Sequence, residues 1–518
     1  MTAVLAANTG DITPPSIAYS ALMPMLIVFG LGLVGVLIDA FFPQRIRSLI
    51  QPIVALLGFI AALIAVILLH GRHETVAAGA VAIDGPALFM QGTILALAIG
   101  SVLLFAERRS DPDGSAFVGD AYQVPGVQLA GAVRKETTEA YPLMAFAVAG
   151  MMLFASSNNL LVMFVALEIL SLPLYLLAGL ARRRRLLSQE AAMKYFLLGA
   201  FSSAFFLYGL AMLYGYSGTV NLGGIADATR VVTNNSTFLY LGIALLLVGL
   251  FFKVGAAPFQ AWTPDVYQGS PTAVTAFMAA GTKVAAFGAL LRVLYVALGP
   301  ARWDWRPIVW AIAIITMVVG AVVAVTQRDI KRLLAYSAIA HAGFILVGVS
   351  AATKDGISSS MFYLVTYGFT TIAAFAVVTL IRTGEGEATD LSMWQGLGKR
   401  SPLLAGIFAF LLFALAGIPL TSGFTGKFAV FSAAIGGDAT VLVVIGLLAS
   451  AVAAFFYVKV VVLMFFQEPR ADGPTVVTGS VLTYAALGLG VAVTLVLGVA
   501  PQPLLDLAQN AANLGFVR

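Results

Sequence analysis

The sequence is dominated by apolar segments that are each long enough to cross a lipid bilayer. A transmembrane helix needs about 20 predominantly apolar residues, and segments of this kind follow one another from residue 19 to residue 500. Of the 518 residues, 60% are hydrophobic and only 10% are charged, whereas a soluble domain contains roughly 25% charged residues. Most of the surface must therefore face lipid. The sequence predicts an all-α integral membrane protein with about fourteen transmembrane helices.

The expected spans are separated by short polar turns, with one exception. The segment 107–140 is polar, with Gly, Asp and Pro scattered through it, and it is expected to form one long loop. The fourteen expected spans lie at 19–42, 49–70, 87–106, 141–157, 159–181, 191–216, 237–267, 271–298, 307–327, 331–352, 356–382, 402–434, 439–467 and 478–500.

The basic residues indicate which side of the membrane each loop faces. Of the 29 Lys and Arg residues, seventeen fall in the loops of one side, six on the other side and six inside the spans. A positive excess marks the cytoplasmic side, so both termini are expected on the periplasmic side of a bacterial inner (plasma) membrane. The net charge of +5 follows from this topology, and the expected partner is the lipid bilayer rather than nucleic acid.

The composition also excludes several kinds of cofactor site. The chain contains no cysteine, so it can neither form a disulfide nor bind an iron–sulfur cluster through thiolates. Its three histidines, at 70, 73 and 341, are too few and too scattered for a metal site. No metal and no cofactor are expected in this chain.

Six basic residues inside the spans need an explanation, because a charged side chain within a membrane is costly and is usually functional. Lys253 and Lys283 lie near the middle of their spans, and a role in transport is preferred for both. Lys427 lies within span 12. Arg292 and Lys459 lie closer to span ends. A long side chain there can extend to water, and this structural explanation is preferred for both.

Glu168 is the only carboxylate deep within an expected span. A buried carboxyl normally takes up a proton unless a cation lies beside it, and the buried lysines are its candidate partners. Lys194 has two interpretations. It follows Glu190 by one helical turn, so the two residues can form an ordinary ion pair on the helix surface, but a function in transport is preferred.

Two spans contain sequences that break helices. Gly255 and Pro258 follow Lys253, and Gly417 and Pro419 precede Lys427. Proline removes a backbone donor and clashes with the preceding turn, and unpaired backbone at membrane depth is tolerated only inside protein or beside water. The breaks fall in spans 7 and 12, which are five spans apart and therefore opposite in direction. This pattern predicts two inverted five-helix repeats, spans 4–8 and 9–13, with a transport site at the breaks.

The predicted divisions follow from these repeats. They are an N-terminal part with spans 1–3 and the polar loop (1–140), a first repeat (141–298), a second repeat (299–467) and a C-terminal span (468–518).

The residues around the breaks resemble the antiporter-like membrane subunits of respiratory complex I. The family signature is similar to residues 252–277, which read FKVGAAPFQAWTPDVYQGSPTAVTAF. Thr282-Lys283, the segment 337–343 and the segment 417–428 continue the resemblance in the same order, and it extends from about 140 to 467. A histidine is common in the family at the position of Gln260, so no relay role is expected for that residue.

Within this family, the pattern favours one of three related subunits. That subunit is similar in its WTPDVY segment (262–267) and in having lysine at both 283 and 427. Subunit M usually has a glutamate at the position of Lys427. Subunit L has a long C-terminal extension, whereas this chain ends shortly after its last expected span.

The resemblance implies a proton-translocating membrane subunit of an NADH:quinone oxidoreductase. It places FMN, the iron–sulfur clusters and quinone in partner subunits, and it implies contacts with subunit M and small membrane subunits. By the same resemblance, Glu168 would pair with Lys253, Lys194 and Lys283 would pass protons along the membrane, Lys427 would be the terminal carrier, and His341 would lie between Lys283 and Lys427.

Three alternatives remain open at this point. The chain can belong to a multi-subunit sodium/proton antiporter, which shares the fold and much of the motif. It can also be a membrane scaffold whose charges only hold helices together. His341, finally, is either a proton relay or a hydrogen-bonded core residue.

Overall fold

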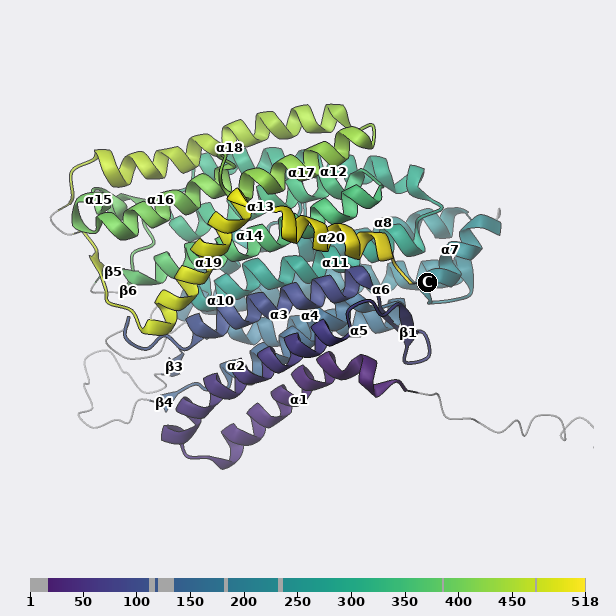
Figure 1. The fold of residues 1–518 in the computed structure, drawn as a ribbon, viewed down its shortest axis with the longest axis horizontal. Helices are drawn as coiled ribbons and strands as arrows, with labels where there is room; N and C mark the ends of the chain where they lie inside the picture. The colour runs from purple at the N-terminus through teal and green to yellow at the C-terminus, as the bar shows by residue number, and fades with distance from the viewer. Residues whose placement is uncertain are drawn as a thin grey trace, which may run out of the picture.

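The structure is a computed structural model that describes residues 17–110, 117–119, 135–180, 185–231, 236–383, 386–470 and 473–517. The described residues form a bundle of long helices whose axes are roughly aligned, with short strands at the two ends of the bundle (Figure 1). Most of the polar loop expected at 107–140 lies outside the described residues.

The helices follow the order of the expected spans. They are α1 (Tyr19–Phe41), α2 (Gln44–Leu68), α3 (Gly85–Phe105), α4 (Ala140–Ser156), α5 (Leu160–Ala178), α6 (Arg185–Ser217), α7 (Leu222–Val231), α8 (Ser236–Val254), α9 (Trp262–Gly269), α10 (Thr272–Phe277), α11 (Lys283–Arg292), α12 (Arg302–Val325), α13 (Ile330–Ser350), α14 (Lys354–Leu380), α15 (Leu397–Arg400), α16 (Pro402–Ala416), α17 (Ser422–Gly436), α18 (Thr440–Phe466), α19 (Val481–Val499) and α20 (Gln502–Leu514). Two π-helical turns, Met278–Thr282 and Val293–Ala297, extend α10 and α11 into one long span, and a 3-10 turn covers Leu391–Trp394.

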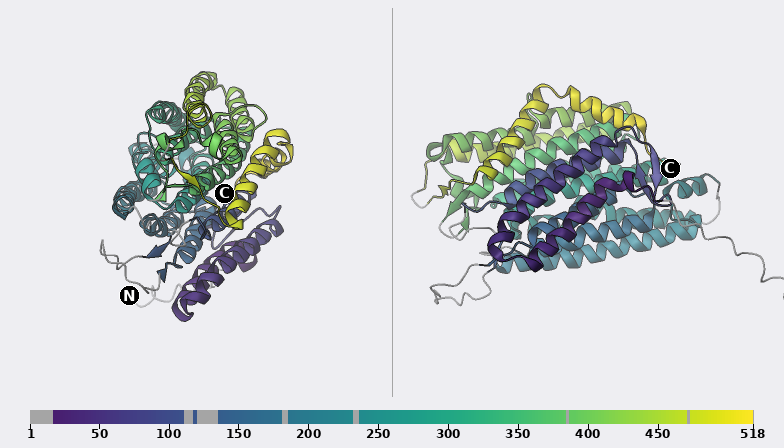
Figure 2. Two further views of the ribbon diagram at one scale, coloured as in Figure 1. Left: turned by 90° about the vertical axis from the view of Figure 1, so that its left-hand side faces the viewer. Right: turned by 60° about the horizontal axis from the view of Figure 1, so that its bottom comes forward.

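The membrane architecture expected from the sequence is confirmed. Within the described residues, 12 helices are long and apolar enough to cross a membrane. The other two expected spans are α4, which has 17 residues, and the broken pair of α16 and α17. The span from Thr272 to Ala297 and helix α14 are buried along their whole apolar lengths. They form the centre of the bundle, while α1 and α2 lie at one margin (Figure 2).

Several helices begin at side chains that accept hydrogen bonds from the first helical turn, as expected of N-cap residues. Helices α3, α5, α13, α14 and α19 begin after Asp84, Asn159, Asp329, Thr353 and Ser480, respectively. These polar residues stand directly before apolar runs, so the sequence defines where the spans start.

The strands are short and lie at the ends of the bundle (Figure 1). Strands β1 (Glu74–Val76) and β2 (Val81–Ile83) form an antiparallel hairpin between α2 and α3, and β3 (Val118–Gly119) pairs with β4 (Lys135–Glu136). A three-stranded sheet has the order β6 (Gly386–Glu387), β5 (Ile381–Thr383) and β7 (Thr475–Val476). The sheet joins the loops that follow α14 and α18.

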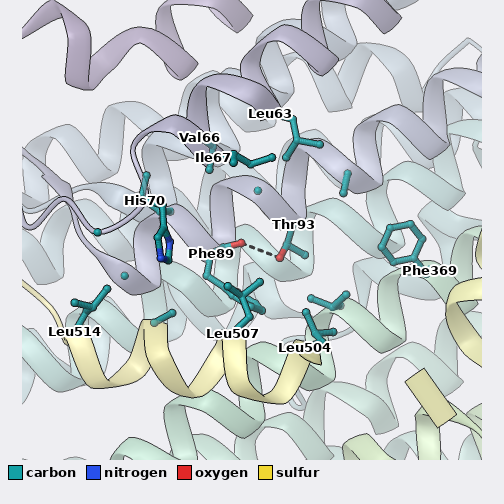
Figure 3. A pocket seen from close by; sticks show the side chains of 17 residues that line it. Leu63, Val66, Ile67, His70, Phe89, Thr93, Phe369, Leu504, Leu507 and Leu514 are labelled. Atoms are coloured by element: carbon teal, nitrogen blue, oxygen red, sulfur yellow. Dashed lines mark hydrogen bonds between the residues drawn. The ribbon is translucent and has the colours of Figure 1, made fainter. Parts of the chain in front are cut away.

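The chain continues beyond its last expected span. At Pro501 it bends, and α20 then packs along α3 and α14 (Figure 1). Between α2, α3, α14 and α20 lies an apolar cavity of about 380 Å³, lined by leucines of α20 and by Phe89 and Phe369 (Figure 3). The hydroxyl of Thr93, which also lines the cavity, donates to the carbonyl of Phe89 at 2.8 Å. The lining therefore offers little to a polar ligand.

Glu107 joins two parts of the chain that are far apart in sequence. Its buried carboxylate accepts hydrogen bonds from the backbone N–H groups of Arg109 (2.5 Å), Ser110 (2.9 Å) and Ser480 (2.8 Å), and from the Thr483 hydroxyl. Burial raises the pKa of Glu107, but these four hydrogen bonds outweigh burial and hold the pKa below its usual value of 4.5. The carboxylate thus fastens the end of α3 to the start of α19.

We expect Glu107→Gln to destabilise the chain by about 1–3 kcal/mol, because the amide leaves buried donors unsatisfied. Since the folded-state pKa is depressed, the contribution is fully present above pH about 4.5 and is lost as the pH falls through the folded-state pKa. Thermal unfolding at pH 7 should separate variant from wild type, and the difference should shrink near pH 4. Glu74→Gln is the control, because Glu74 is half-exposed. Equal loss in both variants would contradict the assignment.

Candidate functional site

Both predicted helix breaks are present, and they begin in the same way. Helix α8 ends at Val254 and helix α16 at Ala416, and the next residue, Gly255 or Gly417, has a positive φ of 78° or 87°. The N–H of the following residue bonds back to a carbonyl five residues earlier in each case. This arrangement is the Schellman ending, which favours glycine at the left-handed position. The equivalence of the two breaks is what inverted repeats predict.

A buried lysine lies at each of these helix ends. Lys283 Nζ donates to the carbonyl of Val254 at 2.9 Å. Lys427 Nζ donates to the carbonyls of Leu415 (3.2 Å) and Ala416 (2.7 Å). The C-terminus of a helix has a partial negative charge, which favours a cation there. The breaks therefore create two sites for a positive charge in the interior of the bundle.

Lys427 has further partners that complete its site. Its Nζ also donates to Ser450 Oγ at 2.8 Å and lies 4.7 Å from the centroid of the Phe344 ring. An ammonium group has three donors, and the two carbonyls with Ser450 provide three acceptors. The charged form is fully hydrogen-bonded although only 5% of the residue is exposed.

Lys253 lies on α8 just before the break and is 3% exposed. Its Nζ donates to Ser171 Oγ of α5 at 2.8 Å and to the Tyr195 hydroxyl of α6 at 3.2 Å. The ring of Trp262, the first residue of α9, stacks on the Tyr195 ring with centroids 4.7 Å apart. Lys253 is therefore enclosed by hydroxyl and aromatic groups.

Glu168 does not form a direct ion pair with Lys253. The residue of α5 that contacts Lys253 is Ser171. Glu168 lies one helical turn before Ser171 on α5, and Glu168 Oε1 is buried without a hydrogen-bond partner. The structure thus places Glu168 one turn from the residue that contacts Lys253, and Ser171 makes the direct contact that the resemblance implied for Glu168.

His341 lies on α13 between two tyrosines. Its Nδ1 is 2.8 Å from the Tyr363 hydroxyl of α14, and its Nε2 is 3.3 Å from the Tyr457 hydroxyl of α18. The Phe344 ring lies 5.9 Å from the His341 ring, centroid to centroid, and 4.7 Å from Lys427 Nζ, so His341 and Lys427 contact the same aromatic ring. Because both ring nitrogens have hydroxyl partners, His341 is also a satisfied core residue, and the geometry fits both interpretations.

Lys194 lies apart from the buried lysines. Its side chain is 41% exposed and pairs with Glu190, one turn earlier, and with Asp265 of α9, each at 2.6 Å. Asp265 pairs in addition with Arg332 of α13 at 2.6 Å. The helix-surface couple with Glu190 is therefore present, together with an acidic partner that the sequence did not suggest.

The prediction for Arg292 is wrong, and that for Lys459 agrees with the structure. Arg292 is completely buried and pairs with the equally buried Asp84 at 2.7 Å, and it also donates to the carbonyl of Ala155. Arg292 was expected to extend to water. Its charge is instead balanced inside the protein by Asp84, which stands at the start of α3. Lys459 is exposed and donates to the carbonyl of Val325 at 3.3 Å.

Sequence reasoning missed the neutral partners of the lysines and of His341. Ser171, Tyr195, Ser450, Tyr363 and Tyr457 are ordinary constituents of apolar spans, and nothing in the local sequence distinguishes them from other hydroxyl residues. Asp265 had a signal, because it is a charged residue seven positions after Pro258 of the first predicted break. Among the described residues, no group of three His, Cys, Asp or Glu side chains could hold a metal ion.

The comparisons with known proteins agree with this arrangement. Residues 157–453 match the family model described as NADH:quinone oxidoreductase/Mrp antiporter, TM. The NADH-quinone oxidoreductase subunit N of Parafrankia sp. (strain EAN1pec) is 70% identical, over 100% of this chain and 99% of its own length. The subunit N of Rhodococcus opacus (strain B4) is 59% identical, over 98% of each chain.

Two solved structures are similar to this chain in three dimensions. A chain of respiratory complex I from Thermus thermophilus is 35% identical, with a TM-score of 0.76, over 94% of this chain and 100% of that chain. A chain of the Mrp complex from Dietzia sp. has a TM-score of 0.80 over 96% and 97% of the two chains, but at 23% identity it shows the fold alone.

The broken helices, each with a lysine at its end, define the class of antiporter-like membrane subunits. Within that class, the chain belongs to the NADH-quinone oxidoreductase subunit N family. The sodium/proton antiporter alternative is reduced to a distant relationship of fold.

Proposed function

We propose that this chain moves protons across a bacterial plasma membrane as part of an NADH:quinone oxidoreductase, by way of buried ionisable side chains. Lys253, Lys283, His341 and Lys427 hold and pass the proton, and Glu168 stabilises positive charge on Lys253. The observation that carries the proposal is the pair of buried lysines, Lys283 and Lys427, at the ends of two equivalent broken helices. A buried cation in a membrane protein marks an ion pathway by default.

The hydrogen bonds explain how these groups can alternate between charged and neutral forms. The direct hydrogen-bond partners of Lys253 are the hydroxyls of Ser171 and Tyr195, so no carboxylate contacts its ammonium group and holds the proton there. Lys427 has three acceptors for its three ammonium hydrogens, and loss of a proton leaves one of them unpaired. A proton that leaves Lys253 and reaches Lys427 thus arrives at a site with more hydrogen-bond acceptors.

Three buried oxygen atoms near the first break have no partner within the described protein. They belong to Glu168, Gln260 and Thr263. Buried polar groups are normally hydrogen-bonded to protein or to water, so these atoms are the places where water would bind along a proton path. Gln260 lies between α8 and α9, and Thr263 lies in the first turn of α9.

The remaining parts of the reaction are assigned to other chains. We assign FMN, the iron–sulfur clusters and quinone to partner subunits, and for the clusters the assignment is supported by the absence of cysteine from this chain. The antiporter-like subunit M and small membrane subunits are its neighbours in the assembly. We also infer that residues 141–298 and 299–467 are the two inverted repeats and that both termini lie on the periplasmic side. The equivalent breaks and the distribution of basic loops support these assignments.

The test compares two lysines of the same chain. We expect Lys253→Ala to reduce the number of protons pumped per NADH oxidised to the level of membrane leak, since a carrier has been removed from the path. Lys459→Ala is the matched control, because Lys459 also lies in a span but is exposed. Proton uptake is measured in inverted membrane vesicles, and immunoblotting of the assembled complex confirms equal amounts. Normal stoichiometry in Lys253→Ala, or equal loss in both variants, would overturn the proposal.

A further inference from the structure

Helix α9 is a short helix that covers Lys253. It follows the first break and has only eight residues, Trp262–Gly269. Its first residue, Trp262, stacks almost flat on Tyr195, with an interplanar angle of 7°, and donates its ring N–H to the carbonyl of Phe252 at 2.9 Å. Tyr195 in turn contacts Lys253 through its hydroxyl. Both rings are buried, so they separate Lys253 from the surface on which Lys194 lies.

Asp265 fastens this helix on two sides. One carboxylate oxygen accepts from Lys194 on α6 and the other from Arg332 on α13, both at 2.6 Å. Lys194 precedes Tyr195 directly in sequence, so the ion pair and the ring stack hold the same two helices together. Arg332 lies in the second predicted repeat, so Asp265 also connects the two repeats.

The far end of α9 is held by polar contacts with the start of α13. Gln268 donates to Asp329 at 3.1 Å and accepts from Arg332 at 3.1 Å, and Lys331 donates to the carbonyl of Ser270 at 2.6 Å. These contacts do not involve α6. A movement of α9 away from α6 would separate the Lys194–Asp265 pair and the ring stack, and it would also open the close packing of Gly269 against Leu187 and Ala191 of α6.

We propose that Asp265 is a positioning residue that keeps α9 closed over Lys253, and that release of its ion pairs opens a water path to Lys253 from the surface that carries Lys194. Lys194, Asp265 and Arg332 have side chains that are 41%, 29% and 28% exposed. Ion pairs this exposed are weak. The ion pairs of Asp265 with Lys194 and Arg332, called the latch below, can therefore separate during turnover. The inference assigns to Lys194 a part in this latch in place of a step in the buried proton path, and it rests on the proposed role of Lys253 as a proton carrier.

The test measures access to the site directly. The chain contains no cysteine, so Ser171→Cys places a single thiol where the contact with Lys253 is made, at a position that is 1% exposed. The assembled complex in inverted vesicles is treated with a small charged methanethiosulfonate reagent, and the labelling rate at position 171 is followed by mass spectrometry. We expect Asp265→Asn in this background to raise the labelling rate roughly tenfold, since local opening controls access to buried groups. Lys194→Gln should also raise it, because that variant removes the α6 half of the latch.

Two further variants distinguish a latch from a general loss of structure. Glu190→Gln removes the other carboxylate that pairs with Lys194 at the same 2.6 Å distance, but Glu190 does not touch α9, so labelling should stay at the background rate. Asp265→Glu retains the charge and should return labelling close to that rate. Labelling in Asp265→Asn and Lys194→Gln at the background rate would overturn the proposal, and so would an equal increase in Glu190→Gln. Because labelling involves no proton transport, failure of the latch and failure of Lys253 as a carrier give separate results.

Discussion

Lys427→Arg should abolish proton pumping almost as completely as Lys427→Ala. A carrier must release its proton in every cycle, and the guanidinium group of arginine does not deprotonate in proteins. The ordinary pKa of arginine is at least about 2 units above that of lysine, so release is at least about a hundredfold rarer. If Lys427 served only as a fixed positive charge at the end of α16, arginine would preserve that charge and restore activity.

The geometry of the site determines which control is needed. A side-chain atom built on Gly417 would lie 2.9 Å from Lys427 Cδ, so the site is narrow and the larger guanidinium can also fail because it does not fit. Thermal stability of the assembled complex separates the two causes, since a misfit lowers stability whereas a lost proton-transfer step does not. We expect proton pumping per NADH to be lost in both variants, with the stability of Lys427→Arg close to wild type. Substantial pumping by Lys427→Arg would show that Lys427 is an electrostatic anchor.

The long spans and their breaks were predictable because their signals are local. Apolar runs of spanning length define the helices, and glycine and proline near Lys253 and Lys427 mark the breaks whatever the rest of the fold does. Helix α20 was not predicted, because polar residues such as Gln502, Asp506 and Asn510 interrupt its apolar positions and Pro501 ends the preceding run. Its helical structure depends on contacts with α3 and α14, which lie far away in sequence.

The same distinction explains the site. The buried lysines were found because a charge within an apolar run is conspicuous in a sequence. Their partners were not found, because Ser171 lies 82 residues from Lys253 and is chosen by tertiary packing. Arg292 was misjudged for the same reason, since its partner Asp84 is 208 residues away. Sequence therefore indicates which groups need a special environment, while the fold decides what that environment contains.

Glu168→Gln should reduce pumping although Glu168 makes no direct ion pair with Lys253. The two hydrogen-bond partners of Lys253 are neutral hydroxyls, and Glu168 lies one helical turn from one of them, Ser171. Removal of the carboxylate raises the free energy of placing a positive charge on Lys253, so the lysine is loaded less often. We expect pumping to fall roughly tenfold, the effect of losing about 1.4 kcal/mol of charge attraction. Glu190→Gln, on the half-exposed surface of α6, should pump normally in the same assay.

Returning a carboxylate to the right face of α5 should partly restore pumping. Ser171 lies one turn from Glu168 and its Oγ is 2.8 Å from Lys253 Nζ, so Ser171→Glu in the Glu168→Gln background places a negative charge beside the lysine. Leu172 is the matched control, because it is the next residue but is 51% exposed on the outer surface of the helix. Leu172→Glu in the same background should restore nothing, since its carboxylate points away from Lys253. The measurement is proton translocation per NADH in the single variant and in the two double variants. Wild-type pumping in Glu168→Gln, or equal rescue from both positions, would contradict the assignment of Glu168 as the charge partner of Lys253.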